Sequence, residues 1–322
     1  MEKATDNVNL PLVSICIPAY NCAEYILEAL NCLCNQSYRN LEIIVVNDGS
    51  TDQTVDLILQ LVDPRIMLVN TLNGGAAKAR NIAYQHATGK FIIFFDADDY
   101  IGPDFVDHQL RKISMNKNAV VLSAWGRFYK NDRHTFREVP LPAGEMLVQD
   151  WINYYWYNCN PMTNPGRAIM CKMLIEKAGL WNENLSLNDD LEFFTRVFLE
   201  ADGIVFNPDA LFYYRSGITG LSTRKGSEAN RSLFDSIEIA TNLVLKKYTA
   251  NAAIRRSCAN LWQGSIHLLY PYEKAMVKIA EEKIRALGGA DLPYRSGGYT
   301  KFLAQVLGWK LTILVKYAIA GG

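Results

Sequence analysis

Several features that would assign a protein to a common class are missing from this sequence. Its 322 residues carry 33 Lys and Arg against 33 Asp and Glu, so the basic surface typical of nucleic-acid binding is not expected. A GxxxxGK[ST] phosphate loop is absent. The four histidines lack the spacing of metal ligands (His86, His108, His134 and His267).

The cysteines and the N-terminus lack the marks of secretion. The seven cysteines stand singly, with neither a CxxC pair nor a Cys/His zinc spacing, so we expect reduced thiols. Residues 1–9 are polar, and the apolar run at 10–18 is too short and strand-like for a signal peptide. We therefore expect a cytoplasmic protein that does not bind nucleic acid.

The first hundred residues alternate strands and helices. Apolar runs predict four strands, and helical spacing predicts three helices between them, which favours right-handed βαβ units and a mainly parallel, Rossmann-like α/β sheet. The strands are expected at 12–18, 41–46, 66–70 and 91–95, and the helices at 24–35, 51–62 and 76–87.

Beyond Gly102 the alternation gives way to other patterns. A helix is predicted at 103–115, strands at 119–125, 166–171, 204–206 and 211–215, and a helix at 191–200, while 126–165 reads as mostly irregular with a helix at 144–157. Helices then follow at 227–249, 252–269, 272–287 and 299–320.

The most informative stretch is the strand that ends in three acids. Phe91–Phe95 is followed by Asp96, Ala97, Asp98 and Asp99, and ligands bind at the carboxyl ends of strands in open α/β sheets. Clustered carboxylates suit Mg²⁺ or Mn²⁺ held together with a substrate's phosphates. An acidic turn that caps the next helix is the alternative.

Two other strands end in polar residues. Pro18 ends the first, placing Tyr20 and Asn21 where a ring could cover a base and an amide could bond its edge. The second ends in Asp48 and Gly49, where the carboxylate could accept hydrogen bonds from a base or ribose. Turns that only cap the following helices explain either pattern as well.

A fourth segment joins glycines to positive charge. Gly74 and Gly75 precede a helix that carries Lys78 and Arg80 in its first two turns. Helix N-termini favour anions, so cations placed there indicate a bound polyphosphate. Solvated charges on a helix face are the alternative.

In order and spacing, these four segments resemble the donor half of family 2 glycosyltransferases, which have the GT-A fold and include bacterial surface-polysaccharide enzymes. The family patterns VSxxxPxYN, VDDGSxD, GxxxARN and DxD match residues 13–21, 46–52, 75–81 and 96–98, with Asn47 in place of the usual acid. A further pattern, EDxxFxxR, matches 189–196 with Asp189 in place of Glu. The resemblance covers about residues 11–216.

The resemblance implies roles for individual residues. Asp48 would contact the base, Asp96 the ribose, and Asp98 the metal that bridges the diphosphate. Asp190 would be the catalytic base, although a helix-capping role is compatible with the same position. Donor contacts would also come from the other residues of these patterns (Pro18, Tyr20, Asn21, Lys78, Arg80 and Ala97).

The match is incomplete where relatives carry a His after the YYR strand. Arg215, or Arg224 with Lys225, is expected to neutralise the departing diphosphate instead, with a structural ion pair of Arg215 as the alternative. Trp181 and Asp189 are further candidates for acceptor contacts. The aromatic segment 151–158 suits either acceptor stacking or core packing.

The last predicted helix, 299–320, is apolar but interrupted by Lys301, Lys310 and Lys316. That pattern favours a helix lying in a membrane interface over one that spans the bilayer. Packing on the protein's own core or on another subunit is the alternative. Peripheral location on the inner face of the plasma membrane would follow.

Taken together, the residues and the resemblance predict an inverting, metal-dependent transferase. It would move a sugar from a nucleoside-diphosphate sugar, with UDP expected, to a saccharide or lipid-linked saccharide. We expect a GT-A domain at 1–225, with a donor half at 11–102 and an acceptor half at 103–225, and a helical region at 226–322. A sugar nucleotidyltransferase and a non-catalytic nucleotide-sugar-binding protein are the alternatives.

Overall fold

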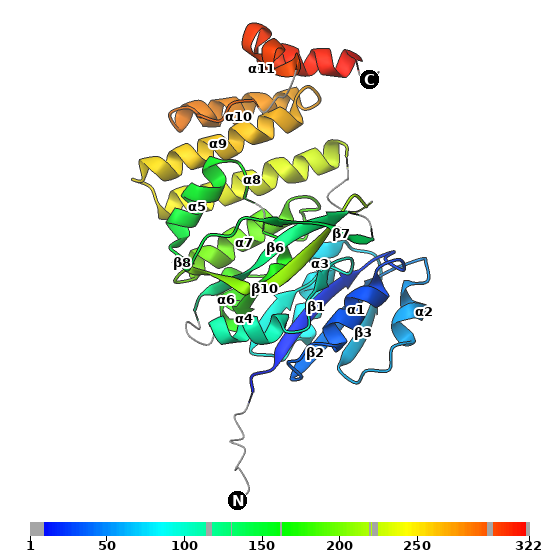
Figure 1. Ribbon diagram of the computed structural model, residues 1–322. Helices are drawn as coiled ribbons and strands as arrows, with labels where there is room; N and C mark the ends of the chain where they lie inside the picture. The colour runs from blue at the N-terminus through cyan, green and yellow to red at the C-terminus, as the bar shows by residue number, and fades with distance from the viewer. Residues whose placement is uncertain are drawn as a thin grey trace, which may run out of the picture. The chain divides into compact units, whose positions relative to one another are not determined.

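The computed structural model describes residues 10–113, 118–129, 131–161, 163–218, 220, 225–294 and 299–319. The chain divides into two compact units (Figure 1). The first comprises Met1–Met146, Thr163–Glu183 and Val197–Thr219, and the second comprises Leu147–Met162, Asn184–Arg196 and Gly220–Gly322. The boundary expected at residue 225 stays a prediction.

The first unit is built on a ten-stranded sheet in the order β3-β2-β1-β4-β9-β6-β10-β5, with β7 paired to β6 and β8 to β10. Its strands are β1 Val13–Ala19, β2 Leu41–Asp48, β3 Ile66–Thr71, β4 Phe91–Phe94, β5 Tyr100–Ile101, β6 Val120–Tyr129, β7 Asp132–Val139, β8 Glu145–Met146, β9 Ala168–Cys171 and β10 Ile204–Ser216.

The direction of the strands decides where the polar loops lie. β1 pairs in parallel with β2 and β4, and β2 pairs in parallel with β3, so the loops that follow these strands share one edge. Ile15, Ile93 and Phe94 are at most 1% exposed, because these strands are covered on both faces. β9 runs antiparallel to β4 and β6. The prediction of an α/β fold whose first four strands form a parallel sheet is confirmed.

Helices complete both units (Figure 1). Helices α1 Ile26–Cys34, α2 Thr54–Leu59, α3 Ala76–His86, α4 Phe105–Ile113 and α6 Lys172–Ala178 belong to the first. The second holds α5 Val148–Tyr157, α8 Ser227–Lys247, α9 Ala252–Leu269, α10 Lys274–Ala286 and α11 Tyr299–Ile319. Helix α7, Asp189–Glu200, begins in the second unit and ends in the first. Helices in the C-terminal region are therefore confirmed.

Three sequence predictions of local structure need correction in detail. Residues 126–165 are not mostly irregular, because β7 pairs with β6 there; its sequence DRHTFREV is polar and half exposed, so it lacks an apolar strand pattern. The strands expected at 204–206 and 211–215 form one strand, β10, with an irregularity between Asn207 and Leu211.

The third correction concerns the last helix, which has nearly the predicted bounds but is not continuous. Gly308 has φ 75° and ψ 163°, a non-helical conformation that breaks α11 in two, and glycine adopts it at little steric cost. Ala320 lies outside the described residues. Among the helices that the structure describes, none is both long and apolar enough to cross a bilayer.

Gly89 offers a test of the packing at the opposite edge of the sheet. A Cβ at this position would lie 2.4 Å from Ser14 Oγ and 2.7 Å from Ser14 N. We expect Gly89→Ala to lower the free energy of unfolding by about 1–3 kcal/mol, because the added methyl group overpacks this site and forces β1 to shift. Urea denaturation measures the change.

Gly102→Ala is the matched control, because a Cβ there would meet no atom within 4 Å. Equal urea midpoints for the two variants would contradict the prediction, because the close approach of Gly89 to β1 would then have no effect on stability.

Candidate active site

The loops after β1 and β2 are joined by hydrogen bonds. Asn21 Oδ1 accepts a hydrogen bond from the N–H of Thr51 at 2.8 Å, and the N–H of Asn21 donates to Ser50 Oγ at 3.1 Å. Asn21 adopts φ 46°, a left-handed conformation that asparagine tolerates better than most residues. The side chain of Asn21 therefore holds the loop in place. Tyr20, which is 46% exposed, is an aromatic side chain at this edge that a ligand could contact.

Asp48 closes the glycine loop. Its carboxylate accepts hydrogen bonds from the N–H groups of Gly74 at 2.7 Å and Gly75 at 2.9 Å, and it is 3% exposed. Each carboxylate oxygen has a second lone pair, so these bonds leave acceptor capacity. The segments at 46–52 and 74–75 thus lie together, as their positions after neighbouring strands require.

Arg80 connects α3 to the acidic turn. Its Nη2 lies 2.7 Å from Asp96 Oδ1, and its guanidinium lies 4.5 Å from the ring centroid of Trp181. Trp181 is only 2% exposed and meets Phe94 edge to face. This burial favours support of Arg80 over the acceptor stacking expected for Trp181. Lys78, by contrast, is exposed, with its chain lying against Gly74.

The acidic turn itself is tightly folded. The N–H of Asp99 donates to the carbonyl of Asp96 at 3.2 Å, Ala97 is buried, and Asp96 and Asp98 are partly exposed. Burial, and then the charge of Asp96, raise the pKa of Asp98 to about 6, against the opposing charges of Arg215 and Arg80. Burial also raises the pKa of Asp99 well above its usual value.

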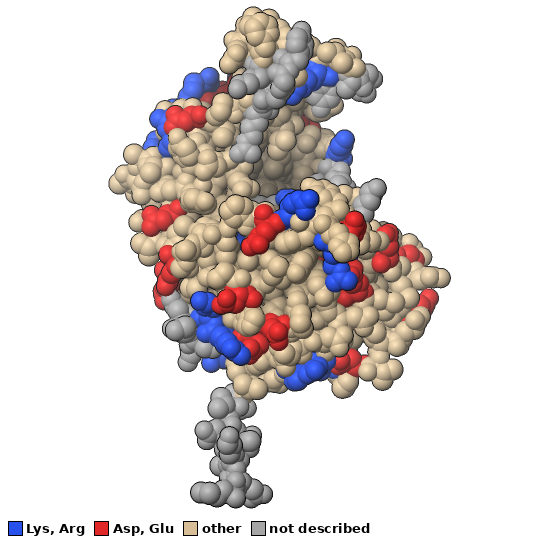
Figure 2. Space-filling model, in the orientation of Figure 1, with Lys and Arg blue, Asp and Glu red and all other residues tan. Residues whose placement is uncertain are grey.

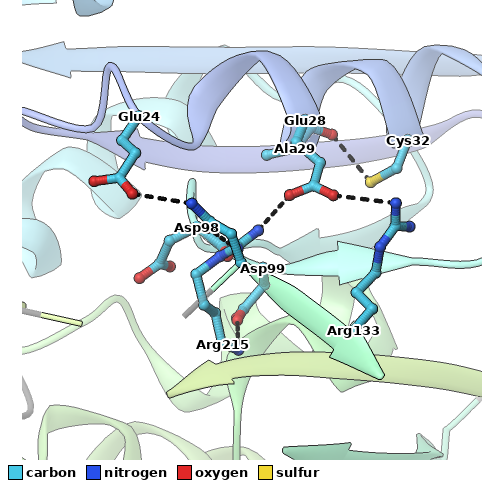
Figure 3. Close-up of polar contacts among 9 residues, drawn as sticks. Glu24, Glu28, Ala29, Cys32, Asp98, Asp99, Arg133 and Arg215 are labelled. Carbon is cyan, nitrogen blue, oxygen red and sulfur yellow. Dashed lines mark hydrogen bonds and ion pairs between the residues drawn. The ribbon is translucent and has the colours of Figure 1, made fainter. Parts of the chain in front are cut away.

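Arg215 anchors this turn from β10 (Figure 3). Its Nε donates to the carbonyl of Asp98 at 2.6 Å, and its backbone N–H donates to Asp99 Oδ1 at 3.0 Å. The guanidinium also pairs with Glu28 of α1 and donates to Asn131 Oδ1 at 2.6 Å. The structural ion pair of Arg215, which was one of its two predicted roles, is therefore present. Contact of Arg215 with a leaving group stays a prediction.

Sequence reasoning missed the partners of Arg215. Glu28 sits in the first turn of α1 and also lies 3.5 Å from Arg133, and Asn131 donates to Glu24 at 3.0 Å (Figure 3). None of these residues stands in a recognisable motif. Only the position of Glu28 on a helix that follows the first polar loop could have drawn attention to it.

The acidic turn fits a divalent cation that also binds phosphate. Asp99 Oδ2 is buried without a hydrogen-bond partner, so the turn has unsatisfied acceptor capacity. Among the described residues, no three His, Cys, Asp or Glu side chains converge as a ligand set. Magnesium-type sites commonly use one or two carboxylates together with substrate phosphates, and Asp98 with its neighbours meets that description.

The expected base lies in the second unit, at the start of α7. Asp190 is partly exposed, and its Oδ1 accepts a hydrogen bond from the N–H of Leu191 at 2.9 Å. Asp189, beside it, is also partly exposed. Farther along α7, Arg196 pairs with Glu192 at 2.7 Å, so the Arg of the matched pattern stiffens the helix.

The aromatic segment of the second unit is divided between core and surface. Trp151 and Trp156 are at most 3% exposed, whereas Tyr154 and Tyr157 are 53% and 43% exposed. The two tryptophans therefore serve packing, whereas the two tyrosines are exposed enough to meet a ligand. Arg224 lies outside the described residues, and Lys225 is exposed.

Comparison with known proteins assigns the class. The model of the glycosyl transferase family 2 matches residues 14–174, so the chain belongs to that family, whose members are glycosyltransferases. The structure of S. aureus TarS residues 1–349 in complex with UDP-GlcNAc aligns with a TM-score of 0.69 and 22% identity, covering 97% of this chain and 88% of that one. The GT-A fold prediction is confirmed.

Individual relatives differ in how much they cover. The Pasteurella multocida chondroitin synthase is 44% identical over 110 residues, which is 34% of this chain and 11% of the synthase. An uncharacterized glycosyltransferase of Rickettsia typhi is 28% identical over 306 residues, covering 92% of this chain and 83% of the relative. This chain thus aligns with only a small part of the synthase.

The pKa of Asp98 gives a testable pH dependence. As the metal ligand that the sequence predicts, Asp98 would have to be ionised, so protons would compete with the cation below a pKa of about 6. We expect the increase in thermal stability that UDP gives in the presence of Mn²⁺ to reach its maximum near pH 7.5. Below pH 6, the affinity for Mn²⁺ should fall about tenfold per pH unit. Thermal unfolding with UDP, with and without Mn²⁺, measures it.

Asp98→Asn is the control, because it removes the titrating group and should abolish the Mn²⁺-dependent part at every pH. A pH-independent effect of Mn²⁺ in the unaltered protein would contradict this assignment of the ligand.

Proposed function

We propose that this protein transfers a sugar from a nucleoside-diphosphate sugar, with UDP as the nucleotide, to a saccharide or lipid-linked saccharide, inverting the anomeric centre. The observation that carries the proposal is the acidic turn of Asp96–Asp99, held between Arg80 and Arg215 beside the loop closed by Asp48. Support for the donor comes from the TarS structure that contains UDP-GlcNAc. Relatives named chondroitin and hyaluronan synthase support a role in polysaccharide synthesis.

The donor would lie along the shared edge of β1, β2 and β4. Tyr20 covers the base, the remaining lone pairs of Asp48 accept from it, and Asp96, oriented by Arg80, accepts from the ribose. Lys78, exposed at the start of α3, meets the diphosphate with the N-terminus of that helix. Asp98 would hold Mn²⁺ or Mg²⁺, which when bound offsets charge on the leaving diphosphate.

Asp190 would take the proton of the acceptor hydroxyl. The oxygen then forms a bond to the anomeric carbon as the bond to the diphosphate breaks on the opposite face. One displacement inverts the configuration, and no covalent intermediate is needed. Membership of a glycosyltransferase family favours this reaction over nucleotidyl transfer, and turnover distinguishes it from mere donor binding.

Replacing the base tests the reaction. We expect Asp190→Asn to keep the affinity for UDP and lower the rate of sugar transfer by at least about 10²-fold, because general base catalysis contributes 10²–10⁴-fold. Glu200→Gln, an exposed acid at the other end of α7, should leave the rate unchanged. Transfer is measured as UDP released in the presence of an oligosaccharide acceptor.

Full activity of Asp190→Asn would exclude Asp190 as the base. UDP-sugar binding without turnover across acceptors would favour a non-catalytic binding protein.

We further propose that α11 contacts an anionic membrane surface. Phe302 and Val306 are each 63% exposed, and Leu311 is 51% exposed. No acidic residue follows Asp291, whereas the same segment contains Arg295 and three lysines. In the space-filling view, most of the visible described atoms of α11 are uncharged with basic atoms among them, while acidic and basic side chains are both scattered over the first unit (Figure 2). This combination suits an interfacial helix.

Vesicle binding tests the role of α11. We expect binding to phosphatidylglycerol-containing vesicles that weakens with salt, and a loss of more than about tenfold in Phe302→Glu/Val306→Glu, since burying each apolar side chain contributes about 1.5–3 kcal/mol. Leu59→Glu/Val62→Glu is the control, with exposures of 67% and 100%. Sedimentation with vesicles gives the affinities, and equal binding by the two double variants would contradict the assignment.

A further inference from the structure

The turn before the proposed base contains a residue in the left-handed conformation. Asn188, two residues before Asp190, has φ 62°, and α7 begins at the next residue. A left-handed residue costs conformational energy unless its surroundings hold it. The direction in which α7 leaves this turn determines where the side chain of Asp190 points, so the contacts of residues 186–188 matter for any chemistry at that carboxylate.

Those contacts come from two buried serines of α8. Ser232 Oγ accepts hydrogen bonds from the N–H groups of Ser186 and Leu187, each at 2.9 Å, and donates to the carbonyl of Leu187 at 2.7 Å. Ser236 Oγ accepts from Asn188 Nδ2 at 2.7 Å. Ser232 is 4% and Ser236 0% exposed.

The spacing of the two serines explains why both can reach the turn. Residues four apart lie one above the other on the same helix face, so Ser232 and Ser236 face residues 186–188 together. Ser232 uses donor and acceptor capacity on the backbone, and Ser236 fixes the side chain of the left-handed residue. The turn is thus held at three consecutive residues by one helix face.

We propose that Ser232 and Ser236 are positioning residues for Asp190, so that one face of α8 orients the turn before the base. The inference rests on the proposed role of Asp190 as base. Neither serine needs to touch substrate; each acts through the turn. Because the family model ends at residue 174, this support for the base lies in a part of the chain that the model does not cover.

The expected effect falls on the chemical step alone. A displacement of a catalytic group by about 1 Å can cost on the order of 10²-fold in rate. We expect Ser232→Ala to lower kcat by about 10- to 100-fold, with the KM for the donor and the affinity for UDP unchanged. In the same variant, amide hydrogen exchange in residues 184–191 should become faster.

Thr241→Val is the matched control. Thr241 is a 1% exposed hydroxyl residue on the same helix, and its Oγ1 donates at 2.7 Å to the carbonyl of Ile237 within α8, not to the turn. Its removal should leave kcat and the exchange of 184–191 at the values of the unaltered protein. A general loosening of α8 would affect both variants alike.

A second variant approaches the turn from the other side. Asn188→Gly keeps the left-handed conformation but removes the amide that bonds Ser236, so it decides the question if Ser232→Ala does not fold. For Asn188→Gly we expect faster amide exchange in residues 184–191 and a fall in kcat smaller than that of Ser232→Ala. Unchanged exchange, or faster exchange with unchanged kcat, would overturn the proposal.

Failure of the proposed base has a different signature. Asp190→Asn would then retain transfer, and the variants at Ser232 and Asn188 would not change kcat although exchange became faster. That pattern would remove the positioning role together with the base.

Discussion

The candidate site depends on the contacts that the buried Arg215 makes with the acidic turn. Three carboxylates within four residues repel one another, and the burial of Asp99 adds a further cost. Arg215 offsets both by donating to the carbonyl of Asp98 and, through its backbone, to Asp99. Because it reaches Glu28 as well, the same guanidinium ties β10 and α1 to the turn after β4.

This arrangement bears on the histidine that the chain lacks after Arg215. For Arg215 to reach a diphosphate, it would have to leave Glu28, Asn131 and the carbonyl of Asp98, and the acidic turn would lose its anchor. Lys78 is already exposed beside the glycine loop and needs no such exchange. The contacts of Arg215 therefore support the proposal that Lys78 meets the diphosphate while Arg215 holds the turn.

The sequence alone predicts the fold correctly where an apolar strand pattern is followed directly by polar residues. Buried strands such as 91–95 read as unbroken apolar runs, and the polar residues that follow them reach one edge because parallel strands must end together. The strand β7 escaped notice because an edge strand paired on one side can be polar. The break at Gly308 was hidden because the apolar spacing continues on both sides of it.

The limits at the site have a similar cause. A motif predicts that Asn21, Asp48 and Trp181 lie near a ligand, but each of these side chains can also make contacts inside the fold. Asn21 and Asp48 turned out to be engaged in loop contacts, and Trp181 lies under Arg80. The residues that hold the acidic turn and the turn before Asp190, such as Glu28 and Ser232, are distant from them in sequence and belong to no motif. They acquire meaning only through the contacts that the fold creates, which is why residues that orient a site are harder to predict than residues that face its ligand.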